Sequence, residues 1–393
     1  MRAVTWQGRR DMRTETVPDP SIKEPTDAIV RITSSGLCGS DLHLYETLGP
    51  FMTPGDIVGH EPMGVVEEVG PAVPDLAVGD RVVMPFQIAC GHCAMCGSGL
   101  QTQCETTQVR EYGTGAELFG YSKLYGSVSG GQAELLRVPH ADYGPIKVPE
   151  GPDDDRFLFL SDVLPTAWQS LEYADVPDGG TVLVLGLGPI GDMACRLAHL
   201  RGLDVVGVDL VDERLDRVQS RGVPVIDLRT VDDVAEAVRE RTAGRGADSV
   251  IDAVGMEAHG SPVASLAQRF AAHLPDAIAE PLMQRAGVDR LAALHTAIDA
   301  VRRGGTISLI GVYGGAADPL PMLKMFDKQL TMRMGQANVR RWLPDLWPLV
   351  TADEDVLGLE SFATQHLSLE DAPEAYARFQ VKDVGFSKVV FRP

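Results

Sequence analysis

The sequence predicts a two-domain α/β protein, in which a β-rich domain accompanies a domain built on a doubly wound parallel sheet. Three observations support this prediction. The length of 393 residues exceeds what one ordinary core accommodates. The chain up to about residue 150 is rich in short strands separated by turns, and from about residue 181 buried strands alternate with helices.

The first part of the chain reads as short strands at 28–32, 63–70 and 81–86, with Gly, Pro and Asp between them. The last residues, 387–393, are again strand-like. We therefore expect the parallel-sheet domain to be inserted within the β-rich domain. The predicted boundaries are 1–163 with 336–393 for the β-rich domain and 164–335 for the inserted one.

The inserted domain begins with the apolar strand TVLVLG, followed by the helix-like PIGDMACRLAHLRG. The segments DVVGVDL, SVIDAVG and GTISLIGVYGG are further buried strands. Strands that alternate with helices in this way form a parallel sheet covered on both faces.

Composition excludes some classes of partner. The formal net charge is −20, whereas nucleic acid and anionic membrane surfaces both require a basic patch on the protein. No stretch reaches the ~18 apolar residues of a membrane span, and the first dozen residues lack the apolar region of a signal peptide. We expect a cytoplasmic protein.

The segment GLGPIG follows a predicted strand and opens a predicted helix, which is the context that a dinucleotide-binding turn needs. Gly186 allows the tight turn, and Gly188 lets the backbone approach a pyrophosphate. Gly191 permits close packing of the helix on the strand, and Pro189 and Ile190 belong to the same turn.

Asp209 ends the next predicted strand, 18 residues after Gly191. A carboxylate there accepts hydrogen bonds from the adenosine ribose and repels a 2′-phosphate, so the sequence predicts NAD rather than NADP. The alternative is a tight strand–helix turn without a ligand.

Four of the six cysteines follow the pattern C-x2-C-x2-C-x7-C: Cys90, Cys93, Cys96 and Cys104. In a reducing compartment such a cluster favours metal over disulfides, and four thiolates describe a closed structural zinc site. The alternative is an iron–sulfur cluster, whose motif continues with x3-C-P. Here the fourth cysteine comes after seven residues and precedes Glu105.

The combination of GLCGSDLHLY, GHEPMGVVEEVG, VGDRV, the four-cysteine segment and GLGPIG resembles the zinc-dependent medium-chain alcohol dehydrogenase family over essentially the whole chain. The resemblance implies a GroES-like catalytic domain with a structural zinc lobe at about 90–104, a Rossmann NAD-binding domain, and a homo-oligomer (dimer or tetramer). In that family the residues matching Cys38 and His60 bind the catalytic zinc. The residue matching Ser40 contacts the substrate oxygen, and the one matching His43 passes the proton to solvent through the cofactor ribose.

The third ligand of this zinc departs from the family pattern. Cys195 lies inside the helix after the glycine turn and is expected to be a small buried filler. Asp162 occupies the segment that carries the third ligand in the family, and Glu61 is the alternative donor, although this glutamate more often sits beside the zinc. An aspartate here, with GGQAELLRVPHADYGPIKVP and MGQANV, resembles the glutathione-independent formaldehyde dehydrogenase branch.

The resemblance therefore implies an enzyme with two zinc ions and NAD that oxidises a small, formaldehyde-like alcohol or hydrated aldehyde. The alternatives are a polyol or amino-alcohol dehydrogenase of the sorbitol or threonine type, and a non-catalytic nucleotide-binding relative. Residues 256–296 are longer than a crossover helix requires. We expect them to fold partly over the cofactor and retain it, which would permit dismutation of aldehydes; the alternative is a surface elaboration or a subunit contact.

Overall fold

The computed structural model describes residues 1–255, 291–313 and 320–393. The chain divides into two compact units: unit 1 comprises residues 1–165 and 337–393, and unit 2 comprises residues 166–336. Most of the predicted insertion at 256–296 therefore lies outside the described residues, and its last residues fall in helix α10 (Ala292–Ala300).

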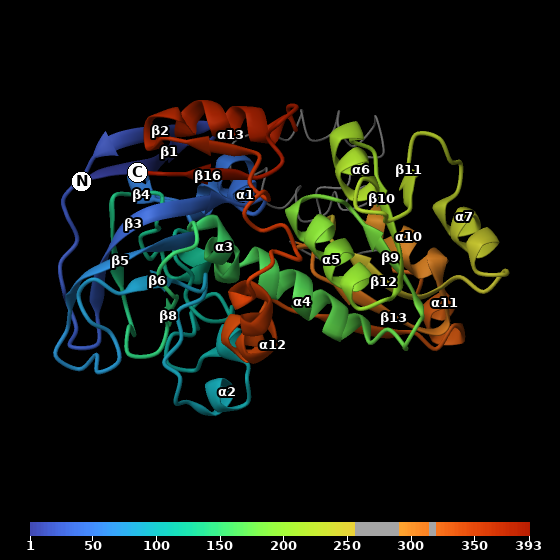
Figure 1. Cartoon of the computed structure of the whole chain (residues 1–393), viewed down its shortest axis with the longest axis horizontal. Helices are drawn as coiled ribbons and strands as arrows, with labels where there is room; N and C mark the ends of the chain where they lie inside the picture. Colours follow the sequence, from blue (N-terminus) through green and yellow to red (C-terminus); the bar gives the residue numbers. More distant parts are fainter. Residues whose placement is uncertain (256–290, 314–319) are drawn as a thin grey trace. The chain divides into compact units, whose positions relative to one another are not determined.

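Unit 1 is built on a seven-stranded sheet and a three-stranded sheet (Figure 1). The larger sheet contains, in spatial order, β15 (Gln365–Leu367), β16 (Val389–Phe391), β3 (Ala28–Leu37), β5 (Glu61–Val69), β6 (Arg81–Val83) and β8 (Ile146–Lys147), with β7 (Leu135–Val138) paired to β3. The smaller sheet contains β2 (Asp11–Thr16), β1 (Arg2–Gly8) and β4 (Asp56–Ile57). The helices are α1 (Asp41–Glu46), α2 (Ala94–Gly97), α3 (Asp155–Leu158), α12 (Val339–Thr351) and α13 (Ala372–Gln380), and α4 (Val163–Ala174) runs on into unit 2.

The pairing of β3 with β5 positions the residues discussed below. The two strands are antiparallel, and Gly36 near the end of β3 lies opposite Glu61 at the start of β5. A Cβ atom at Gly36 would lie 2.0 Å from the Glu61 carboxylate, so a larger residue there would displace that carboxylate. Cys38, just after β3, and His60, just before β5, are consequently held at neighbouring strand ends.

The strand predicted at 81–86 is shorter than expected. β6 ends at Val83, because Pro85 has no N–H to continue the ladder. The chain then leaves the sheet, and the backbone N–H of Phe86 donates to the Ser161 carbonyl at 3.0 Å.

Unit 2 contains a six-stranded sheet in which every neighbouring pair is parallel. Its spatial order is β11 (Val225–Asp227), β10 (Asp204–Asp209), β9 (Thr181–Leu185), β12 (Ala247–Asp252), β13 (Val301–Leu309) and β14 (Thr331–Met334). Its helices, besides α4 and α10, are α5 (Pro189–Leu200), α6 (Asp212–Gln219), α7 (Val234–Arg241) and α11 (Met322–Asp327). Figure 1 shows α5 and α10 on opposite sides of the strands. The predicted fold class is confirmed, although the edge strands β11 and β14 were not anticipated.

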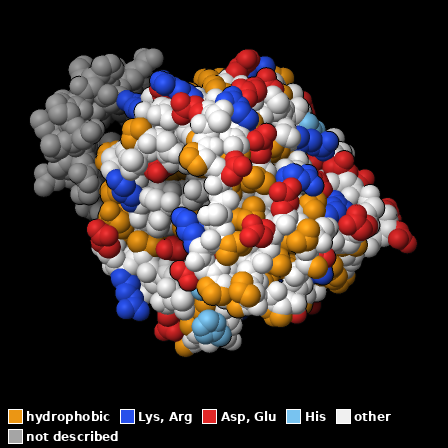
Figure 2. Space-filling model, turned by 90° about the vertical axis from the view of Figure 1, so that its left-hand side faces the viewer, with side chains coloured by type: hydrophobic (Ala, Val, Ile, Leu, Met, Phe, Trp, Pro, Cys, Tyr) orange, Lys and Arg blue, Asp and Glu red, His pale blue; other side chains and the backbone are white. Residues whose placement is uncertain are grey.

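Two further features of the described residues concern membrane-spanning helices and surface charge. No helix among the described residues is both long and apolar enough to cross a membrane. On the face drawn in Figure 2, acidic and basic side chains are interspersed, and no continuous basic patch is visible there.

Candidate active site and metal centres

Four side chains of unit 1 that are distant in sequence form a mixed-donor cluster: Cys38, His60, Glu61 and Asp162. One donor atom from each lies within 4.8 Å of the others. Cys38 and His60 come from the paired ends of β3 and β5, and Asp162 lies just before α4. The structure thus brings together the predicted ligands and also the alternative donor, Glu61.

The distances in this cluster suit a tetrahedral metal site. The Cys38 Sγ lies 3.6 Å from the Asp162 Oδ2, which lies 3.5 Å from the His60 Nε2. Zinc bonds of about 2.0–2.3 Å at tetrahedral angles place the ligand atoms roughly 3.3–3.8 Å apart. A thiolate, a carboxylate and a neutral imidazole also carry two negative charges between them, so this donor set fits Zn²⁺.

Asp41 orients His60. One carboxylate oxygen of Asp41 lies 3.0 Å from the His60 Nδ1, and the other accepts a hydrogen bond from the Cys38 N–H at 3.0 Å. A carboxylate beside Nδ1 favours the proton on that nitrogen and leaves Nε2 as the donor facing the cluster. Asp41 was not among the site residues predicted from the sequence, although its place in GSDLH was an available signal.

Lys388 pairs with one carboxylate of the cluster, Glu61. Its ammonium group is fully buried, lies 2.5 Å from the Glu61 Oε2 and donates to the Leu37 carbonyl at 3.1 Å. The other oxygen, Oε1 of Glu61, is buried without a hydrogen-bond partner. Glu61 is thus already paired with one cation, and its second oxygen is left without a partner. The signal for Lys388 was a lysine directly before the buried strand β16.

Crowded buried anions dominate the electrostatics. Burial, reinforced by the Asp162 carboxylate, raises the pKa of the Cys38 thiol to about 11. Burial also raises the pKa of Glu61, against the opposing effect of Lys388. For His60, burial lowers the pKa, but Asp41 and Asp162 outweigh it and raise the pKa well above its ordinary value. A divalent cation among these groups would relieve their mutual repulsion.

Ser40 and His43 lie beside the cluster at the start of α1. The Ser40 Oγ is 3.2 Å from the His60 Nε2 and 3.4 Å from the Cys38 Sγ. The N–H of His43 donates to the Ser40 carbonyl at 3.1 Å, and a spacing of three residues places both side chains on one side of the helical turn. The structure therefore puts the Ser40 hydroxyl at the cluster, with His43 one helical turn further along the chain.

Two aromatic rings that the sequence analysis did not single out pack edge-on against His60. The ring centroids of Phe86 and Tyr121 lie 6.4 and 6.2 Å from that of His60. The approach of Tyr121 depends on Gly120, where a Cβ would lie 2.4 Å from the Gly59 nitrogen. These rings give the cluster an apolar wall.

The structure also brings the four predicted cysteines of the lobe together, and their sulfur atoms all lie within 4.8 Å of one another. The Cys93 sulfur accepts N–H groups of Cys96 and Glu105 at 3.5 and 3.4 Å, and the Cys104 sulfur accepts the Cys90 N–H at 3.4 Å. Burial opposes ionisation of Cys104, but hydrogen bonds from Thr107 and backbone amides bring its pKa down to about 6. Such amides stabilise thiolates, the form in which cysteine binds zinc.

The glycine turn of unit 2 has the features of a phosphate-binding loop. Gly186 has φ +83°, and a Cβ at Gly191 would lie 1.8 Å from the Gly186 carbonyl oxygen. At Gly188 the nearest atom to a Cβ is 3.8 Å away, so space remains above the turn. Pro189 and Ile190 begin α5, whose N-terminus therefore opens at this turn.

Asp209 connects the end of β10 to this turn. One carboxylate oxygen accepts the Leu187 N–H at 2.7 Å, and the other accepts the N–H groups of Leu210 and Val211 at 2.7 and 3.0 Å. Arg214 lies 3.7 Å from the first oxygen. The carboxylate is thus fixed beside the turn, where a ribose would contact it.

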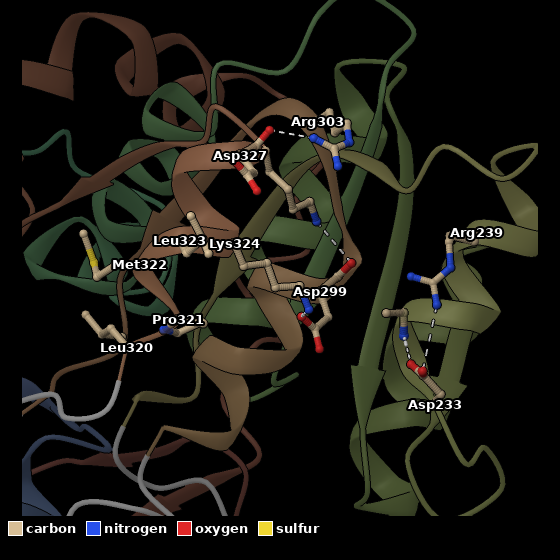
Figure 3. Close-up of a pocket in the computed structure, with 12 residues that line it drawn as sticks. Asp233, Arg239, Asp299, Arg303, Leu320, Pro321, Met322, Leu323, Lys324 and Asp327 are labelled. Carbon is tan, nitrogen blue, oxygen red and sulfur yellow. Dashed lines mark hydrogen bonds and ion pairs between the residues drawn. The ribbon is translucent and has the colours of Figure 1, made fainter.

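A cavity of about 1060 Å³ lies elsewhere in unit 2, between α7, the end of α10 and α11 (Figure 3). Four of its charged side chains are already paired: Lys324 with Asp299, and Arg239 with Asp233. Arg303 donates to the carbonyl of Asp327. Because these charges are satisfied within the protein, this cavity is a poorer candidate than the mixed-donor cluster.

A β-rich unit with these donor clusters and a parallel-sheet unit with a glycine turn define the dehydrogenase class of oxidoreductases. Comparison with known sequences agrees: the profile of the alcohol dehydrogenase GroES-like domain matches residues 24–150, and that of zinc-binding dehydrogenase matches residues 189–269. The chain belongs to the zinc-dependent alcohol dehydrogenase family, and it is a zinc-dependent alcohol dehydrogenase-like oxidoreductase.

Relatives match over nearly the whole chain. An uncharacterized zinc-type alcohol dehydrogenase-like protein, AdhB of Bacillus subtilis, is 38% identical, covering 100% of both chains. A formaldehyde dismutase of Pseudomonas putida is 31% identical, covering 96% of this chain and 94% of its own. Among solved structures, alcohol dehydrogenase TADH from Thermus sp. ATN1 is 33% identical with a TM-score of 0.81, covering 100% of this chain and 99% of its own.

Proposed function

We propose that the protein transfers hydride from a small alcohol or hydrated aldehyde, formaldehyde-like in size, to NAD. The observation that carries this proposal is the convergence of Cys38, His60 and Asp162, with the Ser40 hydroxyl beside them. Two relatives at 31% identity support the substrate class: the formaldehyde dismutase of Pseudomonas putida and the glutathione-independent formaldehyde dehydrogenase of Pseudomonas aeruginosa.

Two zinc ions would be held by separate donor sets. Cys38, His60 and Asp162 would hold one, and the four-cysteine lobe would hold the other in a closed structural site. In the first set a bound zinc supplies Lewis-acid polarisation of the substrate oxygen. Asp41 fixes the imidazole that faces the metal, and Lys388 supports Glu61 beside it.

Ser40, at the N-cap of α1, and His43 on α1 would transfer the substrate proton. Ser40 lies close enough to the donor atoms to accept the proton of a substrate hydroxyl, and His43 would pass it toward solvent. The apolar wall of Phe86 and Tyr121 reduces access of bulk water to this region. A hydrated aldehyde is a geminal alcohol, so the same residues serve both substrates.

NAD would bind unit 2 at the glycine turn, and its nicotinamide ring would accept the hydride. Gly188 leaves room for the pyrophosphate at the start of α5, where Pro189 and Ile190 lie, while Gly186 and Gly191 permit the tight turn and the close packing of the helix. The Asp209 carboxylate, held beside this turn by the Leu187 N–H, would accept hydrogen bonds from the adenosine ribose hydroxyls.

A substrate panel with NAD, followed by NADH absorbance, tests this function. We expect the highest kcat/KM for formaldehyde and the shortest alcohols. Preference for sorbitol-like polyols or amino alcohols would favour the alternative branch, and no NADH with any substrate would contradict the proposal.

Coenzyme choice is tested at Asp209. Asp209→Ala should narrow the preference for NAD over NADP by about tenfold, because hydrogen bonds to a charged acceptor are lost and repulsion of a 2′-phosphate ends. Asp204→Ala, at the other end of the same strand, is the matched control and should leave the ratio unchanged. Equal use of NADP by the unaltered enzyme would show the assignment of Asp209 to be wrong.

We also propose a cytoplasmic location and a homo-oligomer, either a dimer or a tetramer. The six free cysteines support the first point, since thiols persist in a reducing compartment. Size-exclusion chromatography with light scattering tests the second.

A further inference from the structure

Asp252 joins two loops at the carboxyl edge of the parallel sheet. It is the last residue of β12 and is fully buried. One carboxylate oxygen accepts the N–H groups of Val254 and Gly255 at 3.0 and 3.1 Å. The other accepts the phenolic O–H of Tyr313, which lies beyond the end of β13.

The two loops are in close backbone contact. A Cβ at Gly255, where φ is +62°, would lie 2.6 Å from the Val312 nitrogen, and a Cβ at Gly311 would lie 2.2 Å from the Gly255 nitrogen. The glycine turn joins them, because a Cβ at Gly186 would lie 2.6 Å from the Val254 side chain. The loops that follow β9, β12 and β13 therefore form one continuous surface.

This surface lies where a dinucleotide crosses such a sheet. The strand order reverses between β9 and β12, with β10 and β11 on one side and β13 and β14 on the other. Ligands bind outside the carboxyl ends of the strands at this reversal. Asp209 on β10 assigns the adenosine half to one side, so the nicotinamide half extends over the ends of β12 and β13.

Asp252 is held by hydrogen bonds and by no ion pair with a described Lys or Arg. Burial raises the pKa of Asp252, and the Tyr313 hydroxyl and the two backbone amides lower it. Among the described residues, Tyr313 supplies the side-chain donor that links the β13 loop to this carboxylate. Loss of that hydroxyl would leave part of a buried charge unsatisfied, and the loop could shift to relieve it.

We infer that Asp252 and Tyr313 are positioning residues that shape the binding surface for the nicotinamide half of the cofactor. The inference rests on the NAD-dependent function proposed above. Neither side chain needs to touch the reacting atoms, since the pair acts through the backbone of the two loops that it joins.

Tyr313→Phe tests the inference, because it removes the hydroxyl and keeps the ring. Binding of NADH and of AMP to the full-length, zinc-loaded protein is measured by calorimetry. We expect NADH to bind roughly three- to tenfold more weakly, as for a lost hydrogen bond to a charged group. AMP, which lacks the nicotinamide half, should bind unchanged.

Tyr173→Phe is the matched control, because Tyr173 lies on α4 of the same unit, next to Ala174, whose carbonyl accepts from Ser249 in the first half of β12. It should change neither affinity. Asp252→Asn should reproduce the selective loss; if that variant fails to fold, Tyr313→Phe alone decides.

The outcomes separate the two proposals. Equal weakening of AMP and NADH by Tyr313→Phe would show a general structural role and overturn the inference, as would no change in either. Unaltered protein that binds neither ligand would overturn the NAD-dependent function and this inference with it.

Discussion

The two donor clusters of unit 1 are assembled in opposite ways. The four-cysteine lobe takes identical donors from one short stretch, Cys90 to Cys104, and local backbone amides support its sulfurs. The mixed-donor cluster takes three kinds of donor from residues 38 to 162, and its supporting groups are other side chains, Asp41 and Lys388.

This difference indicates what each site depends on. The lobe has little regular structure, so its conformation relies on the cross-link that a metal would provide. Three residues of the mixed-donor cluster stand on the paired ends of β3 and β5, which hold Cys38, His60 and Glu61 together independently of a metal. Metal in the lobe should therefore contribute to folding, and metal in the mixed-donor cluster to chemistry.

Removal of a donor from the mixed-donor cluster should have the largest effect on turnover. Cys38→Ser should reduce kcat/KM by at least about 10⁴-fold, because Lewis-acid polarisation contributes several kcal/mol. The zinc content, measured by metal analysis, should fall from two ions per chain to one, and the melting temperature should be nearly unchanged. Cys195→Ser, on α5, is the control and should retain both ions; one zinc in fully loaded unaltered protein would refute the two-site interpretation.

Removal of the supporting cation should affect stability instead. Lys388→Met leaves the Glu61 carboxylate buried without its partner, which should lower the free energy of unfolding by about 3–5 kcal/mol. Chemical denaturation measures this change. The double variant Lys388→Met/Glu61→Gln should recover most of it, whereas Arg31→Met, which breaks the exposed pair with Glu67, should cost less than about 1 kcal/mol. Equal costs for the two single variants would contradict the role of Lys388.

Removal of a donor from the lobe should destabilise the fold and spare the chemistry. Cys93→Ser should lose one zinc and about 3 kcal/mol of stability, the value for opening a cross-linked loop of roughly 15 residues. Thermal unfolding and metal analysis check both effects. The variant that remains folded should keep its kcat, and a loss of kcat as severe as that of Cys38→Ser would break the distinction between the clusters.

The smallest effect is expected when the mixed-donor cluster is made more similar to the lobe. Asp162→Cys keeps a charged donor, so we expect full zinc content and a kcat within about tenfold of the original. Asp162→Ala removes the donor and should lose zinc or activity. If Asp162→Ala keeps both and Glu61→Ala does not, then Glu61 is the ligand.

What could be predicted from the sequence follows the same division. The lobe and GLGPIG are local patterns, so their spacing alone predicted the arrangement that the structure shows. Asp162 was chosen over Glu61 only through the family resemblance, because Lys388, the partner of Glu61, lies 327 positions away from it. Asp41 was missed because an aspartate in a short turn has many ordinary roles.

The fold was predicted where burial leaves a pattern. The central strands β9, β10 and β12 of unit 2 are almost wholly buried and were recognised, whereas the edge strand β14 was not. Its sequence, TMRM, is only four residues long, and most of its side chains are exposed. Pro85 was the overlooked signal for the early end of β6.

The separation of Glu61 and Lys388 along the chain also affects the order in which the two clusters can form during synthesis. At about 5–20 residues per second, the 327 positions that separate them take roughly 15–65 s to synthesise. The lobe is complete once Cys104 has emerged, whereas Glu61 waits for its counter-charge until all of unit 2 has been made. A nascent chain can therefore load metal into the lobe early, and the mixed-donor cluster reaches its final charge balance only near the end of synthesis.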